Sequence, residues 1–210
     1  MPQDCILIPH PPTCFELIFS ECIIFANPEK IEYIKKTQKP TTKPISIIIS
    51  LPHLTNIATK LKKEYHIALP KFTTTTITDP LISIYPTETE IPISKNISAY
   101  LLYPPIISEK NKDQYYILIT SKSLILSITT RPTYIEQPPH IDIVLTTKKV
   151  IDTITQYTNN INEIPNYLGF DAQWCFILSN NNKKQHQFIY TKNKSYIIKR
   201  HLTGIYIKEQ

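Results

Sequence analysis

Apolar residues recur along the chain with two periodicities, and the longer one marks the expected helices. An apolar residue that returns every three or four positions predicts a helix with one buried face. Three such segments are expected, from 28 to about 36, from 51 to about 65 and from about 147 to about 161. Asn27 is expected to cap the first of them, with Pro28 at the first helical position. Ser50, and either Thr146 or Thr147, are expected to cap the two longer helices.

The remaining apolar segments are short and bounded by Pro, Asn, Asp or Lys, which is typical of strands separated by turns. For the segment 14–25, periodicity leaves open a strand pair or a short buried helix. Strands are expected at 45–49, 66–69, 72–78, 81–85, 91–93, 97–103, 115–120, 123–129, 141–145, 172–178, 186–191, 195–200 and 203–207. The expected class is α+β, with mainly antiparallel sheet and about three helices.

Two strand–helix segments align without gaps at an offset of 96 residues. The strand Ile45–Ser50 lies over Ile141–Thr146, and the apolar positions of the two following helices coincide. Further strands follow each segment, so we predict two strand–helix–meander units in pseudo-repeat. Convergence is the alternative, since any strand followed by an amphipathic helix aligns in this way in an isoleucine-rich chain.

The repeat also predicts how the chain is organised. Residues 1–40 are expected to form an N-terminal arm with a short helix. The first strand–helix–meander unit is expected over 41–140 and the second over 141–210. Packing of all three segments into one compact domain is the alternative, because the length of 210 residues suits one medium domain or two small ones.

Two tandem units of this kind resemble one domain of a DNA sliding clamp, a family that includes the proliferating-cell antigen type and viral polymerase processivity subunits. The resemblance covers about residues 45–207 and rests on topology and spacing. It implies helices that face DNA and carry basic residues. The matching positions are Lys60, Lys62 and Lys63 on the first helix and Lys148 and Lys149 on the second. TATA-binding proteins are a second family with two sheet-rich repeats.

Composition excludes several classes of enzyme. The chain has 2 glycines, too few for a dinucleotide fingerprint, and they are too far apart for a phosphate-binding Walker loop. Neither a Gly-x-Ser-x-Gly elbow nor a His-Glu-x-x-His motif occurs. The chain contains 38 Ile against 2 Val, which indicates a mutational bias of the kind common in viruses and plasmids.

Charge points to nucleic acid as a partner. The formal net charge is +6 at pH 7. Basic residues gather near the C-terminus, where tyrosine and phenylalanine are interleaved with them, and this pattern favours phosphate neutralisation together with base stacking. A solvated sheet edge is the alternative, because edge lysines also prevent aggregation. The candidate binding residues here are Lys192, Lys194, Lys199 and Arg200.

Three further patterns suggest chemistry. Cys5, His10, Cys14 and Cys22 could hold zinc, or the cysteines could be buried thiols in a reducing compartment. Asp171 begins a segment that resembles the first motif of DnaQ-like exonucleases, but Gln173 stands where the second carboxylate belongs. His140 and Asp142 fall on one face of a strand and could form an acid–base pair.

The sequence as a whole predicts a non-enzymatic, nucleic-acid-associated protein without a cofactor, in its most concrete form a clamp-like subunit of viral or plasmid replication or transcription. The expected partner is non-specific nucleic acid or a polymerase-type protein, and a homo-oligomer is possible. An accessory or structural protein that binds other proteins through loops such as 102–109 and 131–140 is the alternative, and a metal-dependent nuclease is a third. An intracellular location is expected, with no membrane contact, because neither a signal peptide nor a long apolar run is found.

Overall fold

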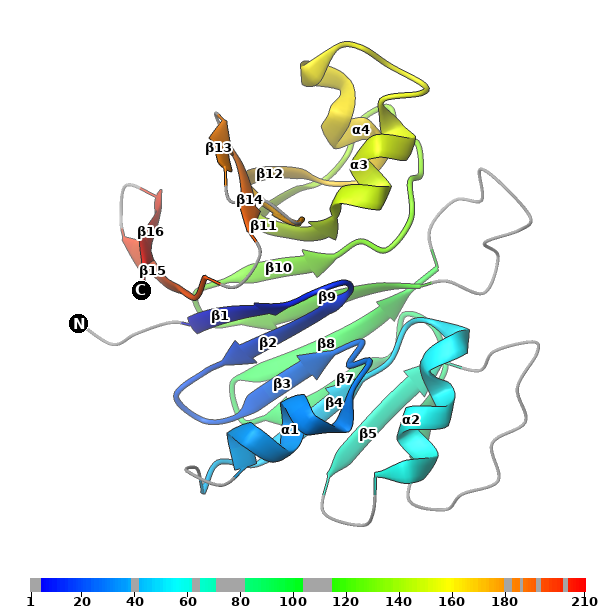
Figure 1. The fold of residues 1–210 in the computed structure, drawn as a ribbon, viewed down its shortest axis with the longest axis vertical. Coiled ribbons are helices and arrows are strands. Elements are labelled where there is room, and N and C mark those ends of the chain that lie inside the picture. Colours follow the sequence, from blue (N-terminus) through cyan, green and yellow to red (C-terminus); the bar gives the residue numbers. More distant parts are fainter. Residues whose placement is uncertain are drawn as a thin grey trace.

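The structure is a computed structural model that describes residues 5–38, 42–61, 65–70, 82–103, 115–179, 183–185, 187–191, 194–201 and 204–210. In these residues sixteen strands form two eight-stranded sheets (Figure 1). The first sheet contains β1 (Cys5–His10), β2 (Cys14–Ile18), β3 (Ile23–Ala26), β4 (Ile45–Ile48), β5 (His66–Pro70), β6 (Ile82–Tyr85), β15 (Tyr196–His201) and β16 (Gly204–Glu209). The second contains β7 (Glu90–Ser94), β8 (Ile97–Leu102), β9 (Tyr116–Ser121), β10 (Ile125–Ile128), β11 (His140–Thr147), β12 (Asp171–Leu178), β13 (Lys183–Gln185) and β14 (Phe188–Thr191).

Both sheets are mixed. The strand order of the first is β16-β15-β1-β2-β3-β4-β5-β6, and that of the second is β13-β14-β12-β11-β10-β9-β8-β7. In the first sheet the pairing is antiparallel from β16 to β3 and parallel from β3 to β6. In the second it is antiparallel from β7 to β10, parallel from β10 through β11 and β12 to β14, and antiparallel between β14 and β13. The central parallel strands are apolar and buried on both faces, as expected for strands covered by helices.

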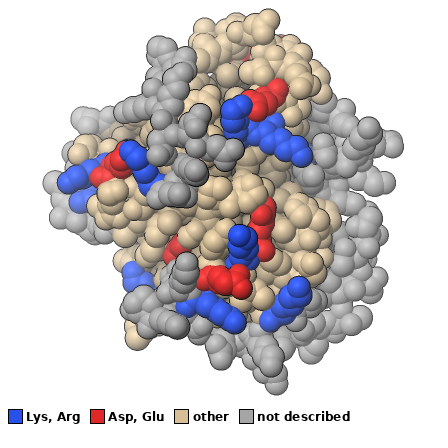
Figure 2. Space-filling view, viewed as in Figure 1, with Lys and Arg blue, Asp and Glu red and all other residues tan. Residues whose placement is uncertain are grey.

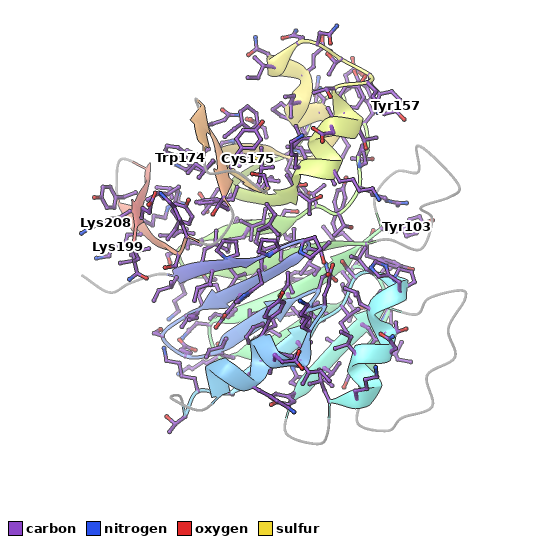
Figure 3. All side chains as sticks on the ribbon, viewed as in Figure 1. Tyr103, Tyr157, Trp174, Cys175, Lys199 and Lys208 are labelled. Carbon is purple, nitrogen blue, oxygen red and sulfur yellow. The ribbon has the colours of Figure 1, made fainter. Side chains whose placement is uncertain are left out.

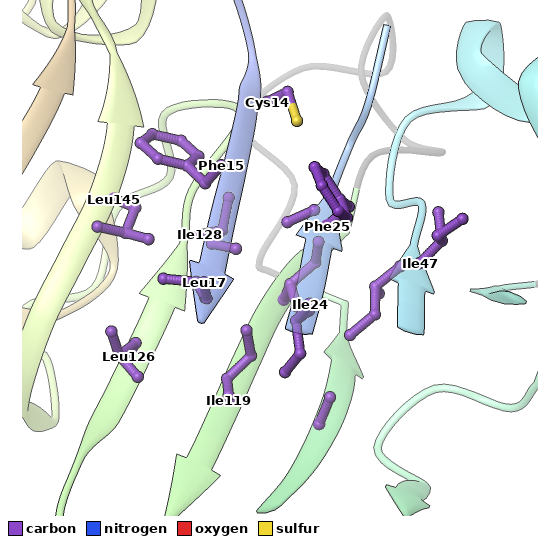
Figure 4. Close-up of a cluster of buried hydrophobic side chains, with 14 of the residues drawn as sticks. Cys14, Phe15, Leu17, Ile24, Phe25, Ile47, Ile119, Leu126, Ile128 and Leu145 are labelled. Carbon is purple, nitrogen blue, oxygen red and sulfur yellow. The ribbon is translucent and has the colours of Figure 1, made fainter. Parts of the chain in front are cut away.

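The two sheets pack face to face, and their apolar side chains form the main core. Phe15, Leu17 and Ile24 of the first sheet lie opposite Leu126 and Leu145 of the second (Figure 4). This cluster includes buried residues from Cys5 to Ile205, so it draws on all three segments predicted from the repeat. The division of the chain at residues 40 and 140 stays a prediction.

Short helices cover the outer faces. The elements on the first sheet are α1 (Ile31–Gln38), η1 (Pro52–Leu54) and α2 (Thr55–Lys60), and those on the second are α3 (Lys148–Ile154), η3 (Ile161–Glu163) and α4 (Ile164–Leu168) (Figure 1). On β11, Leu145 joins the core between the sheets, whereas Val144 packs with α3 and α4 in a second cluster. Because successive residues of a strand point to opposite faces, α3 and α4 lie on the side of the second sheet that faces away from the first.

The predicted fold class is wrong. The protein is β-rich with short helices, and parallel strands follow β4 and β11 where meanders were expected. The two aligned segments are the corresponding central strands of different sheets, so the helices after them, α2 and α3, do not share a face (Figure 1). A hydrophobic pattern shows that a strand is buried but does not show which strand lies beside it, and this is why the sheet topology was missed.

Some sequence predictions fall outside the described residues. These are the whole of the expected strand 72–78, most of the loop 102–109, and Lys62, Lys63 and Lys192. Among the helices that are described, none has the length and apolar content that crossing a membrane requires.

Candidate functional site

The carboxyl ends of parallel strands from both sheets meet at one end of the sandwich. The segment after β4, the segment after β10 and the end of β11 line a common recess there. Ligands of proteins with parallel sheets usually bind outside the carboxyl ends of the strands, where several loops converge. A functional site is therefore expected at this end of the molecule.

Two adjoining recesses form what we call the strand-end groove. The first, of about 190 Å³, is lined by Leu51 and His53 after β4, by residues 130–132 after β10 and by the start of α3. The second, of about 220 Å³, lies between the β1–β2 turn and the ends of β11 and β12. Thr13, Thr147 and Lys149 line both recesses, so the two are continuous.

The lining is rich in hydroxyl and cationic groups. Hydroxyl groups come from Thr13, Thr130, Thr147, Thr153 and Ser179, and cationic or titratable nitrogen groups come from His53, Arg131, Lys148 and Lys149. In the described part of the chain, no aspartate or glutamate lines either recess. Hydroxyl groups can donate and accept hydrogen bonds, and the cationic side chains only donate, so the lining suits a negatively charged ligand.

Hydrogen bonds hold the strand ends in place beneath the groove. Asn27, which follows β3, is fully buried with φ of 51°, and its Oδ1 accepts the Ser50 backbone N–H at 2.7 Å. The Ser50 carbonyl in turn accepts the Tyr115 N–H at 3.3 Å, which joins the first sheet to the start of β9. In the second sheet, Thr146 Oγ1 donates to the Thr129 carbonyl at 2.8 Å. These hydrogen bonds fix the positions of the strand ends that lie beneath the groove.

Arg131 is the most enclosed charged residue of the groove, with 3% of its surface exposed. Its guanidinium carbon lies 5.8 Å from the centre of the Tyr103 ring, and Tyr116 donates its hydroxyl to the Arg131 carbonyl at 3.4 Å. Burial lowers the pKa of Arg131, and the neighbouring Tyr116 and Tyr103 act in the opposite direction. An arginine keeps its charge in proteins, so a fixed positive charge stands at the end of β10.

Of the six described basic residues that were predicted to bind nucleic acid, the structure brings two together in the groove. Lys148 and Lys149 line the groove, and Lys148 Nζ pairs with Asp152 at 2.7 Å. Lys60 is exposed at the end of α2, on the other sheet. Among the described residues on the face seen in Figure 2, basic and acidic side chains are interspersed and form no continuous basic surface.

The C-terminal candidates lie elsewhere. Lys194 pairs with Glu209 at 2.5 Å, and Arg200 pairs with Asp142 of β11. Lys199 lies on β15, on the opposite side of the molecule from Tyr103 in the view of Figure 3. Whether any of the nine predicted basic residues binds nucleic acid stays a prediction, and so do the predicted partners.

The candidate acid–base and exonuclease residues have structural partners. His140 Nδ1 lies 3.1 Å from Asp171 Oδ2, and both side chains are exposed. Asp142 accepts the Ile125 N–H at 2.8 Å and pairs with Arg200, so it does not pair with His140. Gln173 Oε1 accepts the Ile205 N–H at 3.2 Å. These residues lie at or near the amino ends of β11 and β12, away from the groove.

The N-terminal cysteines do not form a zinc site with His10 in the structure. Cys5, Cys14 and Cys22 are buried thiols, and His10 bonds to Glu16 at 2.7 Å and stacks on Tyr33 with 4.5 Å between ring centres. Burial raises the pKa of Cys14 and raises that of Cys22 to about 11, so the thiolate that zinc requires is disfavoured. Across the described residues, no three His, Cys, Asp or Glu side chains are grouped so as to hold a metal ion.

Sequence reasoning did not find the groove. Its described residues come from five separate segments, and neither Thr13, His53 nor Arg131 stands in a recognisable motif. A weak signal was present, because Thr129-Thr130-Arg131 follows one buried strand and Thr146-Thr147-Lys148 spans the end of another. Polar residues that follow two buried strands indicate a site only when the strands are known to be parallel neighbours.

Comparison with known proteins was informative only at the level of structure. No family model and no curated protein matches this chain. Among solved structures, the metallo-beta-lactamase fold protein YhfI from Bacillus subtilis aligns with a TM-score of 0.54 at 9% identity, over 99% of this chain and 100% of that one. CmlA, a diiron beta-hydroxylase from Streptomyces venezuelae, aligns with a TM-score of 0.50 at 10% identity, over 86% of this chain and 45% of that one.

These similarities correct several expectations. The resemblance to DNA sliding clamps is wrong, and with it the prediction of a clamp-like, DNA-binding subunit of viral replication. The prediction that the chain is not an enzyme is wrong as well, because CmlA shows that the fold carries enzymes. At about 10% identity the similarity extends to the fold alone: this chain is folded as a metallo-β-lactamase-type sandwich of two mixed sheets between outer helices.

Proposed function

We propose that the strand-end groove is the functional site of the protein and that it binds a small anionic ligand. The observation that carries this proposal is the convergence of His53, Arg131 and Lys149, from three separate segments, on one recess. Arg131 and Lys149 carry positive charges, which attract anions to a concave site and raise the local anion concentration. Their hydrogen bonds to an ionised group are also stronger than those between neutral partners.

The size of the groove sets the scale of the ligand. Recesses of about 190 and 220 Å³ lie below the usual range of pockets for drug-sized ligands. Each recess therefore suits one charged group or one small organic group. Thr13 and Thr147 lie where the recesses join. The Thr13 hydroxyl donates to Glu29 Oε1 at 2.7 Å, so Thr147 is the hydroxyl group placed to donate to a ligand that extends across both recesses.

Metal-dependent chemistry is the second candidate function, and the likeness to CmlA, a diiron enzyme, favours it. The described residues of the groove do not fit a metal ion. His53 is the one described lining side chain of a type that commonly ligates such metals, since thiolates, carboxylates and further imidazoles are not found among them. The charges of Arg131 and Lys149 would also repel a dication.

An intracellular location also remains our proposal. It is supported by Cys5, Cys14, Cys22 and Cys175, which are all buried as free thiols. Proteins of reducing compartments keep their cysteines in this form.

Anion binding can be tested by thermal unfolding and calorimetry of the purified chain with inorganic phosphate, citrate and, as a cationic control, spermidine. We expect an anion to raise the melting temperature and spermidine to leave it unchanged, because a ligand of the native state stabilises it by mass action. Lys149→Ala should weaken anion binding about tenfold, which corresponds to about 1.4 kcal/mol.

The matched control is Lys95→Ala. Lys95 is exposed in the turn between β7 and β8, next to Asn96, which bonds to Glu21 in the β2–β3 turn. Because the β1–β2 turn borders the groove, the β2–β3 turn belongs to the opposite end of the sandwich. Equal loss of binding in both lysine variants, or no anion binding at low salt, would contradict the proposal.

A further inference from the structure

We propose that Arg131 supplies the fixed positive charge of the strand-end groove, and that the groove binds a phosphate monoester of a small organic molecule without a metal ion. This inference rests on the proposed function and deepens it, because it names the ligand class and the group that recognises it. It also addresses the disagreement between the fold, which carries metal enzymes, and a groove whose described residues offer one common metal-ligating side chain, His53.

Backbone hydrogen bonds and aromatic contacts fix the position of Arg131. The segment after β10 is held against α4, because the Thr133 N–H donates to the Tyr167 carbonyl at 2.8 Å and the Ile135 N–H donates to the Asn166 carbonyl at 2.9 Å. The ring of Tyr103 lies under the guanidinium, and Tyr115 packs edge-on against Tyr103 with 5.5 Å between ring centres. A guanidinium over an aromatic face is stabilised by the charge distribution of the ring.

The segment that follows β4 in the first sheet offers one possible metal ligand to the groove. After β4, the side chains of Leu51, Leu54 and Thr55 are buried, and His53 is exposed toward the groove. Leu51 and Leu54 belong to the core, so this segment fixes its fold with apolar contacts. One imidazole does not hold a metal ion that needs three or four ligands.

The groups around Arg131 match a phosphate better than a carboxylate. A guanidinium binds two oxygens of a phosphate or carboxylate in a planar fork. A phosphate has further oxygens outside that plane, and Lys149, Thr130 and Thr147 approach the same recess from α3, from the segment after β10 and from the end of β11. Donors from several directions satisfy a tetrahedral anion, whereas a planar carboxylate leaves part of them unused.

The second recess explains why an ester is expected in preference to free phosphate. Pro11, Pro12 and Leu178 give it apolar walls, and it opens onto the first recess at Thr13 and Thr147. With the phosphate in the first recess, a small organic group on the ester oxygen would lie against these walls. Burial of apolar surface contributes about 25 cal/mol per Å² to binding, so the ester should bind more tightly than phosphate itself.

The test uses the full chain after dialysis against a chelator, with metal content measured. Calorimetry compares phenyl phosphate, inorganic phosphate and benzoate, each with and without added Zn²⁺. We expect phenyl phosphate to bind most tightly, inorganic phosphate more weakly and benzoate least, with affinities that Zn²⁺ does not raise. Arg131→Lys keeps the charge but loses the fork, and it should weaken phenyl phosphate binding at least about tenfold. Tyr103→Leu is the second variant, for the case in which Arg131→Lys fails to fold. It removes the ring that lies under the guanidinium and should also weaken phenyl phosphate binding. Because Tyr103 is exposed, this change carries less risk to folding.

The outcomes separate this inference from the proposed function. If citrate or benzoate binds and is weakened by Lys149→Ala, while phosphate compounds do not bind, the groove is an anion site but the phosphate assignment is wrong. If phenyl phosphate binding is unchanged in both Arg131→Lys and Tyr103→Leu, Arg131 is not the recognising group. If one Zn²⁺ binds per chain and is required for phosphate binding, the metal-independent assignment is overturned. If no anion binds, the proposed function itself fails.

Discussion

Asn27 and Ser50 tie the ends of β3 and β4 together beneath the strand-end groove. The Asn27 Oδ1 accepts the Ser50 N–H at 2.7 Å, and the Asn27 Nδ2 donates to Ser50 Oγ at 2.9 Å. Both residues are fully buried, and Asn27 has a φ of 51°, a conformation that asparagine adopts more readily than most residues. Ser50 immediately precedes Leu51, which lines the groove, so this pair couples the stability of the sheet to the shape of the site.

Replacement of Asn27 should therefore destabilise the protein strongly. Asn27→Ala loses both hydrogen bonds, leaves the Ser50 groups unpaired and adds backbone strain, at a cost of about 2–4 kcal/mol. Asn27→Gly loses the same bonds but tolerates the positive φ, so it should be less destabilising than Asn27→Ala by about 1 kcal/mol. Urea unfolding of the two variants measures the difference, and equal stabilities would show that the backbone conformation is not strained.

The local elements were more predictable from the sequence than their arrangement. Thr147 is confirmed as a helix cap, since its Oγ1 accepts the Val150 N–H at 3.4 Å at the start of α3. Asn27 was predicted to cap a helix but bonds to Ser50 instead, and the helix begins later, at Ile31. A cap depends on a short stretch of chain, whereas Asn27 and Ser50 follow two different strands that only the folded sheet brings together.

The same distinction explains why the candidate site was missed. The strand His140–Thr147 contains the predicted segment 141–145, so its existence followed from local hydrophobicity. Its parallel neighbours, β10 and β12, could not be read from that pattern, because parallel and antiparallel partners both bury such a strand. Without knowledge of those neighbours, Arg131 and Thr147 have no reason to be placed in one groove.

The ion pair between Asp142 and Arg200 links the two sheets and should matter more than a surface ion pair. Asp142, with 9% of its surface exposed, also accepts the Ile125 N–H at 2.8 Å. Asp142→Ala leaves that N–H and Arg200 without this carboxylate, and we expect a loss of about 2–3 kcal/mol in the free energy of unfolding. The matched control is Glu209→Gln, which weakens the exposed pair with Lys194 and should leave the stability unchanged within error. Similar effects of the two variants would contradict a special role for Asp142.

His66 should make the stability of the protein depend on pH. Its Nε2 lies 3.1 Å from the Tyr85 hydroxyl, and burial lowers its pKa below the 6.5 of an exposed imidazole. Between the lowered pKa of the native state and 6.5, the unfolded state binds more protons, so stability rises with pH in this interval. The stabilisation is complete above about pH 6.5 and is lost as the pH falls further.

The pH effect can be measured by urea unfolding of the wild type and His66→Gln between pH 5 and 8. His66→Gln should flatten this part of the stability profile, because glutamine does not titrate. Tyr85→Phe keeps the apolar surroundings of the imidazole and should retain most of the pH dependence, since burial is the cause of the shift. A profile that is equally steep in the wild type and in His66→Gln would assign the pH dependence to another group.

Gly169 supports the segment that carries Arg131, and its replacement should affect both stability and ligand binding. It lies at the end of α4 with φ of 78°, and a Cβ placed there would come within 2.9 Å of Thr133 Cγ2 and of Tyr116 Cε2. Tyr116 bonds to the Arg131 carbonyl, and Thr133 is two residues further along the same segment. Gly169→Ala must therefore strain the backbone and displace these neighbours, at a cost of about 2–4 kcal/mol.

The displaced neighbours lead to a second expectation for Gly169→Ala. Because Tyr116 and Thr133 position the wall that carries Arg131, the fraction of Gly169→Ala that stays folded should bind phenyl phosphate more weakly than the wild type. Calorimetry well below the melting temperature of the variant measures this loss. Gly204→Ala is the control, since its φ of 137° also strains alanine, while the nearest atoms belong to the end of the Gln173 side chain, away from the groove. Gly204→Ala should lose stability but keep the wild-type affinity for phenyl phosphate. Equal weakening of binding in both variants would mean that general destabilisation, and not the position of Arg131, determines the affinity of the groove.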